Sequence, residues 1–481
     1  MAYLARLDLE VNPLAAHHFL QQAVEKPFAK AQRNRLHFAG VDDKLDDLPA
    51  CCVNSSGLIT LDQTGVPADV GQVFLLSKTG TGKYLPVNVR PLLGTRVISD
   101  TVALYLLVDS ASWGNLGHAL AFFVPILYGI FRRDYSSGGL DAVWAARERL
   151  RLYLRMIGLD QKLLVTRRSN LLPWLTLATA AEPQFIPDKV PDQPRVDLES
   201  VLKGIHIFEE DQVDCHVGAI WQQPVGDQGF TKEAFDVFTD IARNFPPWQV
   251  DQEALVRRVW GLGSLKAGND PCLQPASHCV RALVIVRGNQ AKQKRVVHNL
   301  DEAIRQARNM FPTDHLRLAV VQMEDFTLME EIALASWTDV MIGAVGSAMW
   351  WSIFMPAGGC VIWLLPRKHL TVRERLEESS NWGRSKGVPM WTRQGQLEFG
   401  RNRDLWHIEI VGQDHPPTGE EMIGLNEGNW YFLDVLQMDV VLNPRRLHEA
   451  LYGIMKYFTN RFFQNSTMRN TLIGIARRRL A

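Results

Sequence analysis

The sequence predicts an α/β protein whose second half is a Rossmann-like domain. After residue 280 the chain alternates apolar runs such as ALVIVRG, LRLAVVQM and CVIWLLP with amphipathic helical segments. Strands that are apolar on both faces and alternate with helices are typical of a parallel sheet covered by helices on both sides. Such sheets bind ligands at the carboxyl ends of their strands.

The elements of the second half follow one another at short intervals. We expect strands over 282–288, 316–323, 339–347 and 360–366, and helices over 299–311, 327–337 and 348–355. A further amphipathic helix is expected over 442–463. The stretch 260–277 is dense in Gly, Pro and Ser, which indicates an interdomain linker.

The first half is less regular. Residues 1–109 carry the pattern of short strands and turns, and a helical pattern begins at Ser110. The run LDAVWAARERLRLYLRMIGL predicts one long helix, with Asp141 as its N-cap and Gly158 after its end.

The stretch SKTGTGKY at residues 77–84 resembles a phosphate-binding P-loop. Ser77 stands where the motif needs its first glycine, and Tyr84 stands where it needs the hydroxyl that binds Mg²⁺. The following LPVNVRP alternates and contains two prolines, which favours a strand over a helix. We therefore expect a β-hairpin with its turn at residues 79–82, and Lys83 not directed at a phosphate.

Composition excludes some classes of protein and leaves the compartment open. Of 481 residues 46% are hydrophobic and 22% charged, and 52 basic residues balance 52 acidic ones, so a general nucleic-acid binder is not expected. The longest apolar run, 119–131, is too short to span a bilayer and contains Pro125, so we expect a buried helix there and no transmembrane segment. The N-terminus has no convincing signal peptide. Six cysteines fit no zinc-binding spacing and are too few for a disulfide scaffold.

Three positions have suitable chemistry for an anionic or sugar ligand. Arg287 ends a predicted strand, Arg295 follows it, and guanidinium groups bind phosphate oxygens in a fork. A solvated loop is the alternative there. The turn at Gly346 and Ser347 precedes a helix whose free N–H groups could bind an anion, although close helix–strand packing explains it equally well. His118 lies at the mouth of a buried helix, where a structural histidine is the alternative to a catalytic one.

The segment from NLDEAIRQA to IWLLP resembles glycosyltransferase family 61. This family includes extracellular O-linked and protein O-mannose N-acetylglucosaminyltransferases and plant xylan xylosyl- and arabinosyltransferases. The resemblance covers roughly residues 110–460, is strongest over 320–366, and rests on the order and spacing of motifs rather than on any single one. The residues in register are Arg287, Asn299, Glu302, Glu330, Asp339, Gly343, Gly346, Phe354, Met355, Pro356, Gly358 and Pro366. The segment NLGHALAFFVPIL matches the family's N-(Y/F)-x-H motif.

The resemblance implies a GT-B-like glycosyltransferase with two Rossmann-like domains facing a cleft. It implies inverting sugar transfer from a nucleotide-sugar to a glycan or glycoprotein acceptor without a metal or other cofactor, in the Golgi or endoplasmic reticulum lumen. Arg287, Arg295 and the Gly346–Ser347 amides would bind the diphosphate, Glu330 would organise the donor pocket, and His118 would be the base. The expected parts are a β-rich region 1–109, an acceptor-side domain 110–270, a donor domain 278–430 and a helical segment 431–481 packing back across the domains.

Four departures from the family pattern leave a second interpretation open. Val345 replaces a histidine, Trp351 an asparagine, Trp363 a glutamate and Phe122 an acidic residue. Losing a hydrogen-bonding partner for a buried hydroxyl typically costs about 1–3 kcal/mol. The alternative is therefore a catalytically silent scaffold or interaction subunit. For an enzyme, we expect at least one of the two indoles to line an open cleft together with Arg287. For a scaffold, both should be buried and the cleft filled.

Overall fold

The chain forms two compact units, which are described separately. The computed structural model describes residues 5–6, 51–54, 59–61, 72–74, 84–89, 99–109, 116–157, 173–186, 206–208, 212–221, 231–248, 250–261, 279–287, 296–311, 315–344, 346–365, 403–413 and 439–464. The C-terminal unit combines Met1–Ala29 with Pro246–Ala481, and the N-terminal unit is Lys30–Phe245.

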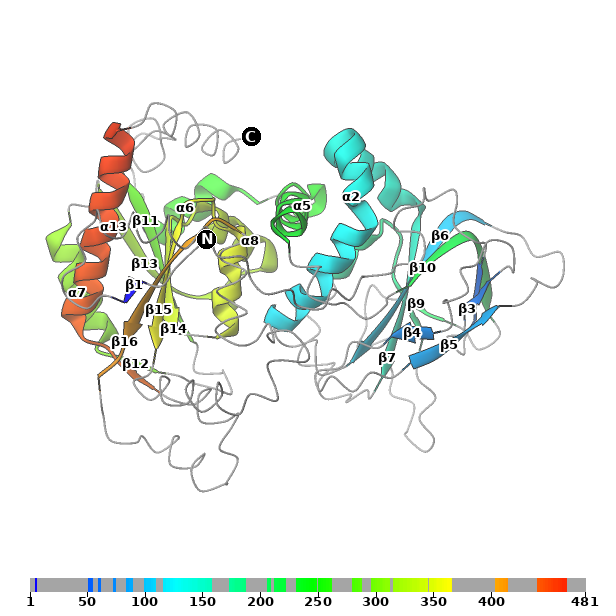
Figure 1. Ribbon diagram of the computed structural model, residues 1–481, viewed down its shortest axis with the longest axis horizontal. Helices are drawn as coiled ribbons and strands as arrows, with labels where there is room; N and C mark the ends of the chain where they lie inside the picture. The colour runs from blue at the N-terminus through cyan, green and yellow to red at the C-terminus, as the bar shows by residue number, and fades with distance from the viewer. Residues whose placement is uncertain are drawn as a thin grey trace, which may run out of the picture. The chain divides into compact units, whose positions relative to one another are not determined.

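The C-terminal unit is built on a six-stranded sheet in which all paired strands run parallel (Figure 1). The strand order is β1-β16-β15-β14-β11-β13. The strands are β1 (Ala5–Arg6), β11 (Val280–Val286), β13 (Leu316–Gln322), β14 (Val340–Ala344), β15 (Cys360–Leu365) and β16 (Trp406–Val411). The parallel arrangement predicted for residues 280–366 is confirmed.

Helices cover both faces of this sheet. The described helices of this unit are η4 (Pro246–Trp248), α6 (Gln252–Trp260), α7 (Leu300–Met310), η6 (Met323–Asp325), α8 (Leu328–Trp337), η7 (Ser347–Phe354) and α13 (Pro444–Gln464). Buried residues of α7 and α13 pack with one face of the strands in a single core cluster. On the other side α8 contacts α6 (Figure 1), and η7 contacts both α8 and β14. Two short strands, β12 (Val297–His298) and β17 (Val440–Val441), pair in parallel outside the main sheet.

The order of the strands determines where this unit can bind a ligand. The first strand of the αβ series, β11, pairs with β13 on one side and with β14 on the other. From β11 the chain therefore passes through α7 to β13 on one side of β11. It then passes through α8 to β14 on the other side of β11. In open parallel sheets, ligands bind at the carboxyl ends of the strands where the direction of strand addition reverses. The carboxyl ends of β11 and β14 form that position here.

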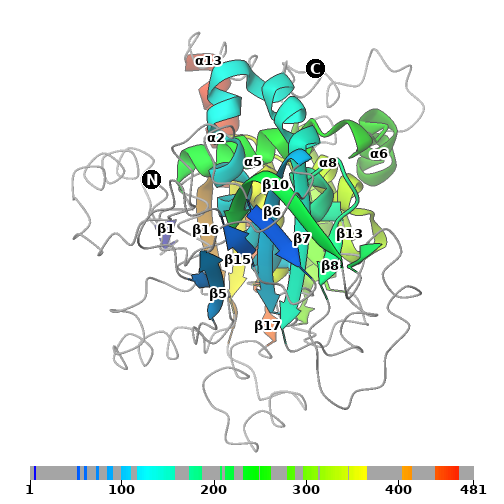
Figure 2. The ribbon, with the colours of Figure 1, turned by 90° about the vertical axis from the view of Figure 1, so that its right-hand side faces the viewer.

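The N-terminal unit contains a nine-stranded mixed sheet in the order β4-β5-β3-β2-β10-β6-β7-β8-β9. The neighbouring strands β10, β6, β7 and β8 run parallel (Figure 2), and β9 pairs in parallel with β8. In contrast, β2 pairs antiparallel with both β10 and β3. The strands are β2 (Cys51–Asn54), β3 (Ile59–Leu61), β4 (Gln72–Phe74), β5 (Tyr84–Val89), β6 (Ser99–Asp109), β7 (Leu150–Ile157), β8 (Gln184–Ile186), β9 (His206–Ile207) and β10 (Val213–Trp221). Two helices, α2 (Leu116–Arg149) and α5 (Lys232–Arg243), pack against each other.

A disulfide crosses this sheet between Cys52 and Cys215, which are registered partners on β2 and β10. Cys279 is also disulfide-bonded, whereas Cys51 and Cys360 are buried free thiols. The chain thus forms disulfides, although its six cysteines are too few for a disulfide scaffold.

The predicted long helix from Asp141 is wrong in its second half. The buried helix expected over 119–131 is confirmed as part of α2, which is broken at Gly139, where φ is 64°. The helix ends at Arg149, and the residues LRLYLRMI form β7 instead, paired in parallel with β6 and β8. Leu152 and Leu154 are fully buried, and Tyr153 between them is 1% exposed. Burial on both faces of a central strand has therefore overridden the helical pattern.

The hairpin predicted around TGTG is supported by its strands. β4 and β5 pair antiparallel, with Phe74 opposite Tyr84, and β5 begins as a strand at the position where a P-loop would begin a helix. The turn at residues 79–82 and Lys83 lie outside the described residues.

The units differ from the expected domains. Strands β2 to β6 share one sheet with β7 to β10, whereas β1 belongs to the C-terminal sheet, so no unit boundary falls at 109 and 110. The boundary falls between Phe245 and Pro246, ahead of the expected linker at 260–277. α6 contacts α8 and β13 and so belongs to the C-terminal unit. α13 packs on α7 within the same unit, and residues 465–481 lie outside the described part of the chain. Within the described residues, no helix is long and apolar enough to cross a membrane.

Candidate functional site

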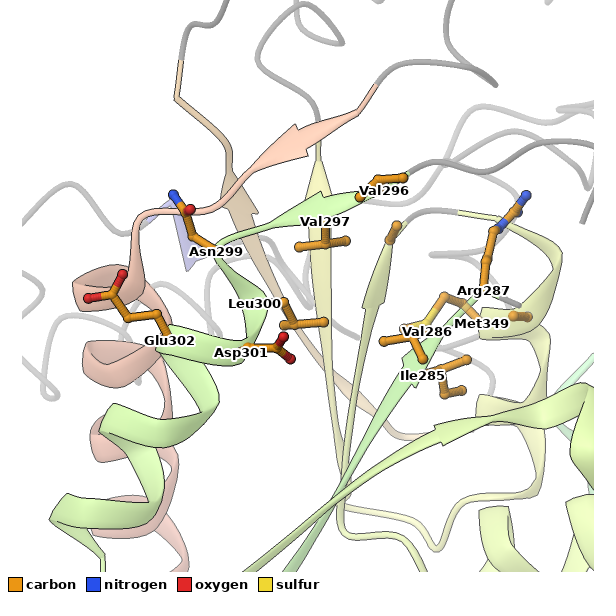
Figure 3. Close-up of a pocket in the computed structure, with 12 residues that line it drawn as sticks. Ile285, Val286, Arg287, Val296, Val297, Asn299, Leu300, Asp301, Glu302 and Met349 are labelled. Carbon is orange, nitrogen blue, oxygen red and sulfur yellow. The ribbon is translucent and has the colours of Figure 1, made fainter. Parts of the chain in front are cut away.

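A pocket of about 500 Å³ opens where β11 and β14 end (Figure 3). Its volume lies within the range of small-molecule sites. It lies at the point where the direction of strand addition reverses, so the topology and the cavity agree. The lining residues are Ile285, Val286, Arg287, Val296, Val297, Asn299, Leu300, Asp301, Glu302, Ala344, Ala348 and Met349.

Arg287 supplies the positive charge of the pocket. It directly follows β11, whose buried apolar residues fix the strand in the centre of the sheet. Burial lowers the pKa of the guanidinium, and the nearby carboxylate of Glu324 opposes that shift. A half-buried guanidinium on a pocket wall suits an anionic ligand, because its planar set of donors matches phosphate and carboxylate oxygens.

The second wall of the pocket is formed by Val296 and Val297, which are held in place by contacts with Asp439. The backbone N–H of Val296 donates to Asp439 Oδ1 over 2.9 Å, and His298 Nε2 lies 2.9 Å from Asp439 Oδ2. Asp439 is buried and immediately precedes β17, which pairs with β12. These contacts fix Val296 and Val297 beside the pocket, where they form part of its apolar surface.

The third wall is the first turn of α7. Asn299 precedes the helix with φ at 63°, a left-handed conformation that asparagine tolerates better than most residues. This sharp turn allows the chain to pass directly from β12 into α7. Leu300 is buried in the core cluster and sets the rotation of the helix, so that the next residue, Asp301, lines the pocket.

The fourth wall requires Gly343 on β14. A Cβ atom at this position would lie 2.6 Å from Met349 Sδ and 3.3 Å from the Ile285 carbonyl oxygen. A Cβ atom would displace the Met349 side chain and crowd the Ile285 carbonyl oxygen, so glycine gives η7 the room to approach β14 with Met349 and Ala348 lining the pocket. Gly346 precedes η7 and accepts from the Met349 backbone N–H over 3.1 Å, so the expected turn before a short helix is present.

Glu330 has a structural position in α8. Thr327 and Glu330 form a reciprocal capping box, in which the Thr327 backbone N–H donates to Glu330 Oε2 over 2.9 Å. Glu330 Oε1 accepts from Arg258 over 2.7 Å. The cap and Arg258 together lower the Glu330 pKa. This carboxylate is therefore engaged within α8 and α6, and it is absent from the lining of the pocket described above.

The neighbouring Glu331 behaves differently. Burial, together with the negative charges of Glu324 and Glu330, raises the pKa of Glu331 to about 9. The side chain is therefore neutral at pH 7. Glu324 thus interacts with both Glu331 and Arg287, which links α8 electrostatically to the end of β11.

The remaining predicted site residues are only partly described. His118 lies in the first turn of α2, in the N-terminal unit, and its side chain is not among those that the structure describes. Arg295 and Val345 lie outside the described residues, and for Ser347 and Phe122 only the backbone in a helix is described. The structure thus brings Arg287 and the start of η7 together at one pocket.

The tryptophans that replace polar family residues are core residues. Trp351 is 4% exposed and packs on Phe354, and Trp363 is 1% exposed and hydrogen-bonded to His407. The expectation that an indole lines an open cleft with Arg287 is wrong, because neither residue is among the pocket's lining. The expectation of a filled cleft is also wrong, since the pocket between β11 and β14 remains open.

Sequence reasoning missed Asp301 and Met349 as pocket residues. The signal for Asp301 was its place in the first turn of the helix that follows the arginine-ended strand. No sequence pattern distinguished Met349, because its place beside the pocket depends on how closely η7 approaches Gly343.

The comparison with known families decides the class of this protein. The profile of the family described as Glycosyltransferase 61 matches residues 116–362, more than half of the 481-residue chain. The chain belongs to glycosyltransferase family 61. The matched segment of this family 61 protein begins at α2, with His118, and extends through Arg287, the pocket and the start of η7 to β15.

Other comparisons add little. No curated protein matches the chain significantly. Among solved structures, a D-isomer specific 2-hydroxyacid dehydrogenase family protein from Aeromonas salmonicida subsp. salmonicida A449 shares 10% identity over 75% of this chain and 96% of its own, with a TM-score of 0.17. A D-2-hydroxyisocaproate dehydrogenase shares 12% identity over 76% and 98%, with a TM-score of 0.13. Scores this low inform neither the fold nor the function.

Proposed function

We propose that this family 61 protein is an inverting glycosyltransferase that binds a nucleotide-sugar in the pocket at the carboxyl ends of β11 and β14. The observation that carries the proposal is Arg287 on the wall of an open pocket at the reversal point of a parallel sheet, in a chain of this family. The acceptor is a hydroxyl of a glycan or glycoprotein.

The residues have distinct roles in this reaction. Arg287 offsets the charge of the diphosphate, with Arg295 as its proposed partner, and the Gly346–Ser347 amides donate to phosphate oxygens. His118 removes the acceptor proton as the hydroxyl oxygen forms a bond to the anomeric carbon. The bond from that carbon to the diphosphate breaks on the opposite side, and its electron pair leaves with the nucleoside diphosphate.

The proposed reaction needs no metal ion. Guanidinium groups and backbone amides stabilise the charge that develops on the leaving diphosphate, which is the task a divalent cation performs elsewhere. Glu330 contributes by holding the start of α8 rather than by contacting the donor, because its carboxylate is engaged by the cap and Arg258.

We also propose the GT-B arrangement, in which the two units face each other across a cleft and His118 approaches the donor from the acceptor side. The disulfide between Cys52 and Cys215 supports an oxidising compartment such as the lumen of the secretory pathway, since cytosolic proteins seldom retain structural disulfides.

Binding of nucleoside diphosphates tests the proposal. We expect uridine or guanosine diphosphate to bind the wild type at micromolar to millimolar concentration, and Arg287→Ala to weaken binding about tenfold or more. Arg305→Ala is the matched control, because Arg305 is an exposed arginine on α7 outside the pocket lining. Failure of the wild type to bind any nucleoside diphosphate at millimolar concentration would exclude the transferase.

The second candidate function is a catalytically silent scaffold that keeps the family fold. The burial of Trp351 and Trp363, where the family resemblance expects polar ligands, favours it. A scaffold and an enzyme differ in turnover. Release of nucleoside diphosphate from a panel of nucleotide-sugars, in the presence of glycoprotein acceptors and abolished by His118→Ala, would exclude the scaffold.

A further inference from the structure

The pocket carries opposite charges on opposite sides. Figure 3 shows Arg287 and Met349 on one side, and Leu300 and Asp301 on the other, with the Asp301 carboxylate turned toward the side of Arg287. Among the residues that the structure describes, the Asp301 carboxylate has no hydrogen-bond or ion-pair partner. Glu302, its neighbour, points the other way and accepts from Gln306 Nε2 over 3.0 Å.

This charge arrangement restricts how a ligand can lie. A carboxylate repels phosphate, so the anionic half of a ligand must lie toward Arg287. The half beside Asp301 must instead carry hydrogen-bond donors, since an ionised carboxylate only accepts. Two adjacent hydroxyl groups match its two oxygens, whereas a single amide or an apolar group would leave an acceptor unsatisfied.

The apolar surface between the two charges fits the same orientation. Val297 and Leu300 adjoin Asp301, and Ile285 and Val286 adjoin Arg287. A ribose ring presents C–H groups to such a surface while its 2′ and 3′ hydroxyls project from one edge. A pocket with a cationic end, an apolar middle and an end that accepts hydrogen bonds from a diol is complementary to a ribonucleoside diphosphate.

We propose that Asp301 accepts hydrogen bonds from the 2′ and 3′ hydroxyls of the donor's ribose and selects ribonucleotides over deoxyribonucleotides. This inference rests on the proposed function, because it assigns a binding residue for the donor in the same pocket. Asp301 fixes the direction of the nucleotide, and Arg287 binds the diphosphate at the opposite end.

The test compares ribose and deoxyribose ligands. Affinities of uridine diphosphate, 2′,3′-dideoxyuridine diphosphate and inorganic pyrophosphate are measured by calorimetry, with the guanosine pair alongside, for the wild type, Asp301→Ala and Glu253→Ala. Glu253→Ala is the matched control, since it removes an exposed carboxylate at the same position of another helix, the second residue of α6, outside the pocket lining. Thermal unfolding of each variant checks that it is folded.

We expect the wild type to bind a ribonucleotide about tenfold more tightly than its dideoxy counterpart, because hydrogen bonds to a charged acceptor are among the stronger ones. In Asp301→Ala the ratio should fall to about one, with pyrophosphate binding unchanged or tighter, while Glu253→Ala keeps the ratio.

Two other results overturn the inference in distinguishable ways. If the wild type binds nucleoside diphosphates and Asp301→Ala keeps the ratio, Asp301 does not bind the ribose and the proposed function stands. If the wild type binds none of the nucleotides at millimolar concentration, the inference fails together with the proposed function.

Discussion

Trp363 donates its indole N–H to Nδ1 of His407 over 2.8 Å within the core of the C-terminal sheet. The two residues lie on neighbouring parallel strands, β15 and β16, and their rings stack with centroids 6.0 Å apart. Trp363 occupies the position where the family resemblance expects a glutamate. The buried pair explains how a large residue fits at this position, because its ring packs on His407 and its N–H is hydrogen-bonded.

Removing this hydrogen bond should destabilise the C-terminal unit. Trp363→Phe leaves the buried His407 Nδ1 without its donor and creates a small cavity, so we expect the free energy of unfolding to fall by about 2–4 kcal/mol. Guanidinium denaturation measures the change. A double-mutant cycle with His407→Phe separates the hydrogen bond from the cavity, and purely additive effects would show that the two residues are not coupled.

Acidification should destabilise the N-terminal sheet through His216. This histidine is 3% exposed, and it lies 2.8 Å from Thr101 Oγ1 and 2.7 Å from the Tyr153 hydroxyl, which donates to Asp214. Burial lowers the His216 pKa to about 4, Arg151 adds to that shift and Asp214 opposes it.

The unfolded chain binds this proton below about pH 6.5, whereas the folded chain binds it only near pH 4. Stability from the neutral imidazole is therefore complete above pH 6.5 and is lost as the pH falls to 4, by about 3 kcal/mol in total. Amide hydrogen exchange of β10 peptides at several pH values measures the loss. His216→Gln should remove this slope, and the exposed His315→Gln should keep it. An equal slope in the His216 variant would contradict the assignment.

The disulfide should contribute strongly to the N-terminal unit. It joins residues 163 positions apart, so its loss releases a long loop in the unfolded state. We expect Cys52→Ala/Cys215→Ala to lower stability by about 2–5 kcal/mol. Urea denaturation with and without reductant provides the measurement. Reductant should have a smaller effect on the double variant than on the wild type, and equal effects on both would argue against the contribution.

Gly343→Ala should close the fourth wall of the pocket. The added Cβ conflicts with Met349 Sδ and approaches the Ile285 carbonyl, so we expect a loss of about 1–3 kcal/mol in stability and weaker nucleoside diphosphate binding. The same substitution in a Met349→Ala background should cost less, because the conflicting side chain is gone. If the cost is the same in both backgrounds, the contact with Met349 is not its cause.

Glu330→Ala should affect stability rather than binding. The substitution removes half of the capping box and the contact with Arg258, which together contribute about 1 kcal/mol. Thermal unfolding should show this loss, while nucleoside diphosphate affinity stays within about twofold. A tenfold loss of affinity would instead assign Glu330 a direct role in the donor pocket.

The C-terminal sheet could be predicted because its signals are local. Strands β11, β13, β14 and β15 are mostly apolar, and the helices between them bury one side, as at Leu300, Ala303 and Ile304 in α7. Such periodicity is a property of residues that are close together in the sequence, and it does not depend on contacts with distant residues. The arginine that ends β11 could be placed at the ligand-binding edge for the same reason, since the carboxyl ends of parallel strands share one edge.

The sequence by itself thus determined the alternation of the main-sheet strands β11, β13, β14 and β15 with their helices, and the position of Arg287, whereas the short strands β12 and β17 and the strand β16 were not predicted. Only the tertiary structure decided that residues 150–157 form β7, that Trp351 and Trp363 are buried, and that Asp301 faces the pocket. The physical reason is that each of these depends on contacts between residues far apart in the chain. A strand flanked by β6 and β8, an indole bonded to His407 and a carboxylate opposite Arg287 exist only after the chain has folded.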